Sequence, residues 1–436
     1  MGVSKSDSII IVGGGAFGLS TALHLSQKGH TDISVFDKDD SIPPRFSAAN
    51  DLNKIARAEY EDPFYTDLTI KALEAWKTPL YAPHFHQTGF FHCVSEEAPQ
   101  KAIETLYRFQ ASAEKNALIK PHVSPIKNRQ DARDGCWQLD GELPGWHGYL
   151  NKFDGYVHSG NALAAVYRAA QAAGVRFFLG EQGAVDEVVY VSTLPGRKAS
   201  GIRTKNGRFH PSSLVIVAAG AGVNRLVPEL GTSVVAKSWS VAHVHLTDDE
   251  VSALRGIPVI YARDLGFFFE PDPKTNLLKL CPMGGGYINT DPKNGVSYAP
   301  EVLSDSAFLP EEDEAQLRKL LAQTLPSLSD RPFVRKSLCW FADTNDSDFI
   351  VDYIPNTSDS IIVLSGDSGH AFKMFPVLGS FATALLEAND NKQPVARWRW
   401  KEPKEAGKAD WGGDVSWRLG QSKEFVSILP PRAAKL

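Results

Sequence analysis

The sequence predicts an α/β protein built from two interleaved domains, and three observations support this fold class. The chain has 436 residues, which is more than a single hydrophobic core normally serves. Residues 8–37 read as strand, glycine turn, helix and strand, the order of a βαβ unit. Residues 235–330 hold a succession of strand-forming segments, so we expect an α+β second domain on a mixed or antiparallel sheet.

The glycine turn of the first unit has the spacing GxGxxG in Gly13, Gly15 and Gly18, and Asp37 ends the next strand. The first glycine permits a tight turn, the second lets backbone amides approach a pyrophosphate, and the third lets the helix pack closely on the strand. Asp37 is placed to accept hydrogen bonds from a ribose hydroxyl. This pattern predicts a Rossmann-type dinucleotide-binding domain, whereas an unrelated glycine turn would leave the position of Asp37 to chance.

A second unit of the same domain begins near residue 154, where a segment with helical periodicity, NALAAVYRAAQAAG, precedes the strand-like RFFL. The strand-like segments that follow, up to residue 217, predict a small antiparallel layer that returns to the main sheet. The tail is rich in Trp, Lys and Pro, and we expect it to wrap the surface. The expected division is 1–49, 151–230 and 331–390 for the dinucleotide-binding domain, 50–150 and 231–330 for the substrate domain, and 391–436 for the tail.

Composition excludes several functions. A net charge of -5 provides no basic field for nucleic acid, and no apolar run approaches the roughly 18 residues that a membrane span needs. The four cysteines, at 93, 136, 281 and 339, lack CxxC or Cys/His spacing, so we expect no metal site.

Several segments, in the same order along the chain, resemble those of the sarcosine-oxidase-like FAD amine oxidases. The resemblance is strongest to the fungal fructosyl amino acid oxidases (amadoriases) and to the L-saccharopine and L-pipecolate oxidases, and it covers nearly the whole chain. It implies FAD as cofactor and a glutathione-reductase-like FAD-binding domain. The segments are SAANDLNKIAR (47–57), LVIVAAGAGVN (214–224), IPVIYARDLGFFFEPD (257–272), LLKLC (277–281), SLCWFADTNDSDFIVD (337–352) and GDSGHAFKMFP (366–376).

The resemblance implies that Cys339 carries the flavin covalently, through a thioether to its 8α-methyl carbon. A free buried cysteine that acts as a small apolar residue is the alternative, and we expect that role for Cys93, Cys136 and Cys281. Further FAD contacts are implied for Gly13, Gly15, Ala16, Phe17, Gly18, Asp37, Lys38, Ser47, Asn50, Lys54, Val185, Asp367, Gly369, Phe372 and Lys373.

Three cationic residues match functional positions of the resembled family. Lys279 matches a lysine that activates oxygen near the flavin ring, where a fixed positive charge stabilises superoxide. Lys373 and Arg57 match residues that hold the substrate carboxylate, a guanidinium with two hydrogen bonds and an ammonium as a point charge. Each has a simpler alternative: a solvent-facing lysine, a surface charge, or an ion pair of Arg57 with a nearby acid. His370 and Tyr261 are weaker candidates for the pocket wall.

One departure from the fructosyl branch bears on the substrate. Fructosyl enzymes follow the lysine strand with an Asp-Glu pair that contacts substrate, whereas Pro282 and Met283 follow here. Fructosyl enzymes also generally lack an arginine at the position of Arg57. We therefore expect an FAD-dependent oxidase of the C–N bond of an N-substituted amino acid of the saccharopine, pipecolate or sarcosine type, reducing O2 to H2O2. The alternatives are a deglycating fructosyl oxidase, a flavin dehydrogenase, a secondary-metabolism amine oxidase that gives a cyclised product, and a non-catalytic flavin-binding protein.

The final tripeptide Ala434-Lys435-Leu436 resembles a peroxisomal address that an import receptor reads at a free C-terminus. An accidental tripeptide is the alternative. Peroxisomal location would suit an oxidase that makes hydrogen peroxide. We expect a monomer with the amino acid, oxygen and the import receptor as partners, and neither nucleic acid nor membrane.

Overall fold

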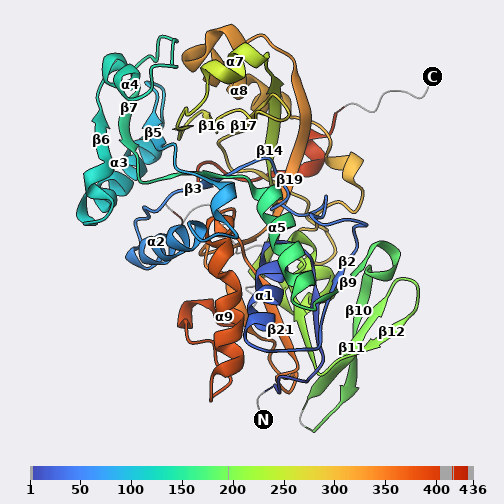
Figure 1. Ribbon diagram of the computed structural model, residues 1–436. Helices are drawn as coiled ribbons and strands as arrows, with labels where there is room; N and C mark the ends of the chain where they lie inside the picture. Colours follow the sequence, from blue (N-terminus) through green and yellow to red (C-terminus); the bar gives the residue numbers. More distant parts are fainter. Residues whose placement is uncertain (1–2, 195, 403–414, 416, 431–436) are drawn as a thin grey trace, which may run out of the picture.

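The computed structural model describes residues 3–194, 196–402, 415 and 417–430. The tripeptide Ala434-Lys435-Leu436 lies outside these residues. Figure 1 shows two sheet-based halves, with the N-terminus beside the smaller sheet. Among the described residues, no helix combines the length and apolarity that crossing a bilayer requires.

A six-stranded sheet forms the core of the half that contains the glycine turn, in the strand order β20-β21-β13-β1-β2-β9. Its pairs are parallel except β20 with β21. Alternate residues of the first strand face opposite layers: Ile9 and Ile11 pack with the helices, and Ile10 and Val12 pack with a three-stranded sheet. The elements are β1 (Ile9–Val12), β2 (Ile33–Asp37), β9 (Arg176–Leu179), β13 (Leu214–Val217), β20 (Ile350–Tyr353), β21 (Ile361–Ser365), the helices α1 (Ala16–Gln27), α5 (Ser159–Ala172), α6 (Val223–Leu226) and α9 (Phe375–Glu387), and the small sheet β10 (Val185–Ser192), β11 (Arg197–Thr204) and β12 (Phe209–Pro211).

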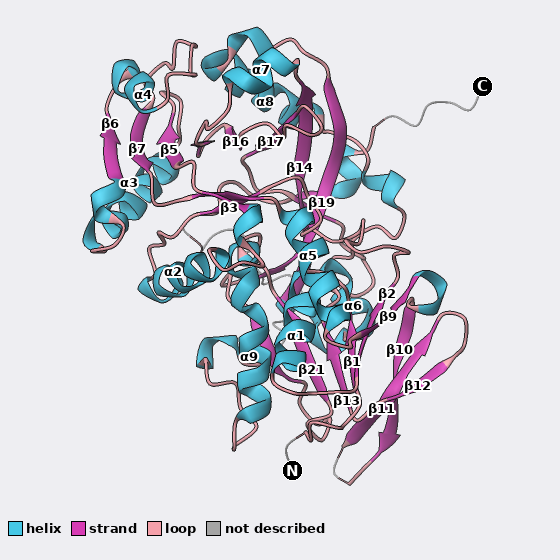
Figure 2. Cartoon of the chain, viewed as in Figure 1, coloured by secondary structure: helices cyan, strands magenta, loops and turns pink. Residues whose placement is uncertain are grey.

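A ten-stranded mixed sheet forms the other half (Figure 2). One of its faces packs against α4, α7 and α8 in a large hydrophobic cluster. Helix α3 packs against strands β5 and β7 in a separate cluster, and residues of β14, β15, β17 and β19 line a cavity. The strands are β5 (Phe90–Val94), β6 (Val123–Ile126), β7 (His147–Asn151), β14 (Val234–His245), β15 (Val259–Ala262), β16 (Gly266–Phe268), β17 (Leu277–Pro282), β18 (Tyr287–Ile288), β19 (Phe333–Thr344) and β22 (Lys423–Glu424), and the helices are α3 (Gln100–Lys115), α4 (Arg129–Gly135), α7 (Asp248–Ala253) and α8 (Glu311–Thr324).

A three-stranded sheet and one helix connect the two halves. The sheet has the order β3-β8-β4, from β3 (Lys54–Ala56), β8 (Gly155–Val157) and β4 (Phe85–His86). The helix α2 (Pro63–Trp76) starts at a defined N-cap, because Asp62 accepts a hydrogen bond from the amide of Phe64 and proline occupies the first turn. Trp76 at its end donates its indole N–H to the carbonyl of Lys373, at 2.7 Å.

The observed pairing differs from the expected division in two places. The segment 331–390 was assigned to the dinucleotide-binding domain, but β19 pairs with β14 along the large sheet before the chain enters β20. The described part of the tail is only partly a surface wrap, because Trp398 is fully buried and β22 pairs with β18. The two differences have separate causes. A strand-forming pattern does not specify its sheet, and tryptophan supplies a large apolar surface for burial.

Candidate active site

A cavity of about 1440 Å³ lies between the two halves, with the glycine turn at one end and the open face of the large sheet at the other. It is lined by almost all the residues singled out from the sequence. Gly18 alone of that set does not line it. Those that do are Gly13, Gly15, Ala16, Phe17, Asp37, Lys38, Ser47, Asn50, Lys54, Arg57, Val185, Tyr261, Lys279, Cys339, Asp367, Gly369, His370, Phe372 and Lys373.

The glycine turn leaves backbone amides open to the cavity. Gly13 has φ +113°, and a Cβ there would lie 2.3 Å from the carbonyl oxygen of Ala218. Helix α1 begins after Gly15, and no side chain caps its first amides. A Cβ on Gly18 would lie 1.8 Å from the carbonyl of Gly13, so this glycine permits helix packing. The arrangement suits a pyrophosphate at the positive end of a helix.

Two half-buried carboxylates lie along the cavity wall. Asp37 accepts a 2.7 Å hydrogen bond from the amide of Gly14, and burial raises the pKa of its carboxyl. Asp367 accepts from the amides of Ala342 and Gly369, and burial raises its pKa to about 6. The glycine turn, the cavity and these two acceptors together fit a dinucleotide such as FAD.

The open face of the large sheet carries the next group of residues. The strand register places Cys339 opposite Trp239, Lys279 opposite His243, and Tyr261 opposite Phe267. Burial raises the pKa of the Cys339 thiol, and nearby Lys54 partly opposes this. Among the described residues, no group of three or more His, Cys, Asp or Glu is arranged to hold a metal ion.

Lys279 does not stand alone but shares a carboxylate with Lys54. Oδ2 of Asp51 accepts from Lys54 Nζ at 2.7 Å and makes a close contact with Lys279 Nζ. Lys279 also donates to the carbonyl of Asn53 at 2.8 Å. Burial alone would raise the pKa of Asp51, but the two ammonium groups hold it well below its usual value. Two cations and one anion leave this cluster with one positive charge.

Arg57 and Lys373 form a second cationic group, and it contains no such acid. Arg57 donates to the backbone carbonyl of Glu59 at 2.5 Å, and its guanidinium carbon lies 4.5 Å from the ring centre of Phe109. Lys373 Nζ donates to the hydroxyl of Tyr60 at 2.8 Å. In the part of the chain that the structure describes, neither cation forms an ion pair with a carboxylate.

The carboxylate of Glu59 is hydrogen-bonded to residues other than Arg57. It accepts from Tyr149 at 2.9 Å and from Asn151 at 3.1 Å, and Asn151 also donates to Asp154 at 2.8 Å. Burial and the neighbouring Glu59 raise the pKa of Asp154 well above its usual value. Both effects favour the protonated form of the Asp154 carboxyl.

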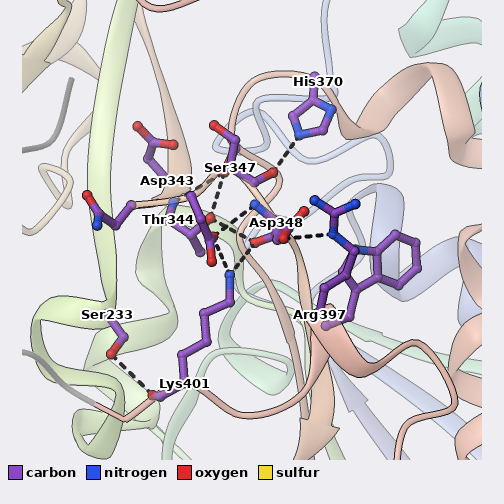
Figure 3. Close-up of polar contacts among 12 residues, drawn as sticks. Ser233, Asp343, Thr344, Ser347, Asp348, His370, Arg397 and Lys401 are labelled. Carbon is purple, nitrogen blue, oxygen red and sulfur yellow. Dashed lines mark hydrogen bonds and ion pairs between the residues drawn. The ribbon is translucent and has the colours of Figure 1, made fainter. Parts of the chain in front are cut away.

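His370 supports Tyr60 from behind. Its Nδ1 lies 3.0 Å from the Tyr60 hydroxyl and its Nε2 lies 2.8 Å from the carbonyl of Ser347, in the loop after β19. Figure 3 shows the contact of His370 with Ser347. It also shows the hydrogen bond of Arg397 to Asp348, which is 2.9 Å long and holds the same loop. Burial lowers the pKa of His370 well below its usual value, so the ring is neutral.

Sequence reasoning missed the residues that support the cations: Asp51, Glu59, Tyr60, Asp154 and Trp417. Asp51 lies within one of the segments that carry the resemblance, three residues before its partner Lys54, but nothing in that segment indicates its second partner, Lys279. Trp417 packs edge-on against Tyr60 and accepts a hydrogen bond from Arg263 through its carbonyl. Such contacts join distant segments, so local pattern does not predict them.

The fold and the cavity define a flavoprotein oxidoreductase, and comparison with known proteins agrees. Residues 8–385 match the DAO family, described as FAD dependent oxidoreductase, and the chain belongs to this family. It is 31% identical over 424 residues to the L-saccharopine oxidase of Schizosaccharomyces pombe, covering 93% of this chain and 96% of that protein. It is 24% identical to the peroxisomal sarcosine oxidase of Mus musculus, covering 86% and 91%.

Solved structures of deglycating enzymes share the fold. Amadoriase II of Aspergillus fumigatus, in complex with FSA, superposes with a TM-score of 0.88 at 29% identity, covering 98% of this chain and 97% of that one. Amadoriase I of the same organism gives 0.87 at 32% identity, with the same coverage. The FAD-binding fold expected from the sequence is thus confirmed.

Asp51→Asn tests whether one carboxylate anchors both lysines. Removing one partner of a buried ion pair leaves an uncompensated charge, so we expect the free energy of unfolding at neutral pH to fall by about 3–5 kcal/mol. Because the folded-state pKa of Asp51 is depressed, its contribution is present above the usual pKa and is lost as the pH falls below about 4. As the pH falls through the acid range, the free energy of unfolding should therefore decrease less for the variant than for the native protein. Urea unfolding across pH measures this difference.

The matched control is Glu387→Gln, which removes the partner of Lys28 in an ion pair whose two side chains are about half exposed. We expect a change of no more than about 1 kcal/mol. An Asp51→Asn protein as stable as this control would contradict the anchoring role.

Proposed function

We propose that this protein is an FAD-dependent oxidase of the C–N bond of an N-substituted amino acid, with O2 as acceptor and H2O2 as product. One observation carries the proposal: a single cavity joins the glycine turn to two buried basic side chains, Arg57 and Lys373, that have no carboxylate partner among the described residues. The relatives include oxidases whose names state saccharopine and sarcosine as substrates.

The substrate carboxylate is the ligand that this cationic group fits. A buried cation is costly unless it is paired, so an incoming carboxylate supplies what the protein leaves out. The planar guanidinium of Arg57 offers paired hydrogen bonds, and Lys373 offers a point charge. Held by both, the amino acid has one orientation in the cavity, and its nitrogen and adjacent carbon are fixed for reaction.

When bound, FAD supplies hydride acceptance and transfer of electrons to oxygen. We propose that Cys339 holds the flavin through a thioether to its 8α-methyl carbon, because the thiol faces the cavity beside Lys54 and Lys279. The single positive charge of the Lys54–Asp51–Lys279 cluster favours the electron transfer that turns oxygen into superoxide.

The chain around residue 282 favours an unglycated substrate. Pro282 and Met283 line the cavity where fructosyl enzymes are expected to place an Asp-Glu pair, so no carboxylate is present there to bind sugar hydroxyls. This supports a substrate of the saccharopine, pipecolate or sarcosine type. The likeness to the amadoriase structures makes deglycation the second candidate.

An anaerobic screen of flavin absorbance tests the function. Sarcosine, pipecolate, saccharopine, N-methyl amino acids and fructosyl-lysine are added in turn, and bleaching of the oxidised flavin band marks a substrate. We expect bleaching by at least one of the unglycated amino acids and none by methylamines that lack the carboxylate, because the cationic clamp then has no ligand. Bleaching by fructosyl-lysine alone would establish the second candidate, and bleaching by none would refute both.

Lys279→Met separates the two half-reactions. Loss of a preorganised charge where charge develops should slow reoxidation of the reduced flavin by oxygen roughly 100-fold. Anaerobic reduction by substrate should change little, because Arg57 and Lys373 remain. Stopped-flow measurement of both rates provides the check, and equal reoxidation by variant and native protein would assign oxygen activation elsewhere.

Cys339→Ser tests the covalent link. The native protein should keep its yellow chromophore after acid precipitation, and the variant should release it, because a hydroxyl does not form the thioether. Cys281→Ser is the matched control, since Cys281 is a buried free thiol on the same cavity wall. Retention of colour by Cys339→Ser would place the attachment at another residue.

We further propose that Ala434-Lys435-Leu436 directs the chain to the peroxisome through the import receptor. The support is the sequence itself together with the proposed production of hydrogen peroxide.

A further inference from the structure

Lys373 is held by neutral groups only. Its side chain is buried, with 5% of the residue surface exposed, and Nζ donates to the Tyr60 hydroxyl at 2.8 Å and to the carbonyl of His370 at 3.0 Å. The nitrogen lies 5.2 Å from the ring centre of Tyr60. A charged ammonium in this position receives dipoles and an aromatic face but no counter-ion among the described residues.

The charged groups around Lys373 do not compensate for this. Burial, and then the positive charge of Arg57, lower the pKa of Lys373 well below its usual value, while Glu59 and Asp154 oppose the shift. Both acids are hydrogen-bonded to Asn151, and neither forms an ion pair with Lys373 among the described residues. From the packed helix α2, Tyr65 directs its hydroxyl to Asp348, and in α9 the single ionisable residue, Glu387, lies at the far end.

We infer that Lys373 stands in the free enzyme as a neutral amine and takes up the proton that the substrate ammonium loses. This rests on the proposed function. An N-substituted amino acid reaches the cavity as a zwitterion, yet hydride can leave only from a carbon beside a neutral nitrogen with a free lone pair. When the substrate carboxylate binds, it stabilises an ammonium at Lys373.

The proton balance then closes inside the site. One N–H bond of the substrate ammonium breaks, one N–H bond forms at Nζ of Lys373, and no proton is exchanged with solvent. The clamp is completed in the same step, because the new ammonium pairs with the carboxylate that induced it. When the product carboxylate departs, Lys373 again lacks a counter-ion and returns the proton to water.

A ligand that has a carboxylate but no amine distinguishes a neutral Lys373 from a permanently charged one. Only the neutral amine takes up a proton from solvent when such a ligand binds. The probes are butanoate and cyclohexanecarboxylate, in which methylene replaces the nitrogen of sarcosine and of pipecolate. Binding is followed by calorimetry of the holoenzyme at about pH 7.5, in two buffers of different ionisation enthalpy, which yields the protons taken up per ligand. We expect about one proton for the native protein, because the ligand brings none of its own.

Lys373→Arg keeps the charge but accepts no proton near neutral pH. It should bind the probes with no proton uptake, and its anaerobic flavin reduction should rise about tenfold per pH unit up to the pKa of the substrate amine. Lys336→Met is the matched control, because Lys336 lines the same cavity but pairs with Glu314 at 3.0 Å. Its proton uptake should equal that of the native protein.

Each outcome decides one question. Probe binding without proton uptake by the native protein would overturn the inference, and this result does not require that any variant folds. Failure of both probes to bind would overturn the cationic clamp and with it the proposed function. Proton uptake with no bleaching by any amine in the screen would support the protonation of Lys373 and refute the oxidation.

Discussion

The cavity holds two buried basic side chains, Arg57 and Lys373, to which the described residues offer no ion-pairing carboxylate. Burying an ion without a partner is costly, so the surroundings of the guanidinium must offset the cost in other ways. Arg57 receives a backbone carbonyl and aromatic faces. The nearby acids Glu59 and Asp154 are both hydrogen-bonded to Asn151 instead. This arrangement stabilises the guanidinium, and the guanidinium can then form an ion pair with the carboxylate of a ligand.

The second cationic cluster in the same cavity is built differently, and the contrast assigns a role to each. Asp51 accepts from both Lys54 and Lys279, so the two ammonium groups share one counter-ion without any ligand. A carboxylate substrate therefore gains more from the unpaired group than from the paired one. The residual charge of the paired cluster remains available for a smaller anion that forms during the reaction.

The sequence predicted the parts of this site that depend on local rules or on resemblance. The spacing of Gly13, Gly15 and Gly18 is dictated by a turn, a close approach to the cofactor and a packing contact within a few residues, and the structure shows the turn at Gly13 and the packing contact at Gly18. Cys339, Lys279 and Lys373 came from segments matched to a family. Asp51 and Asp154 were not predicted, because their roles depend on partners such as Lys279 and Ala58 that lie far along the chain. The sheet that β19 joins was missed for the same reason, since strand pairing is a tertiary property.

Strand β19 links the two sheets that form the two ends of the cavity. It begins in the large sheet, carries Cys339 past the cavity, and leads through one loop into β20 of the six-stranded sheet. The same loop presents the carbonyl of Ser347 to His370, which in turn orients Tyr60 and, through it, Lys373. A shift of this strand would therefore move the proposed flavin attachment and the carboxylate clamp together. Because one strand positions both the proposed attachment and the clamp, the fold sets the distance between the cofactor and the substrate nitrogen. This distance does not depend on two loops that move independently.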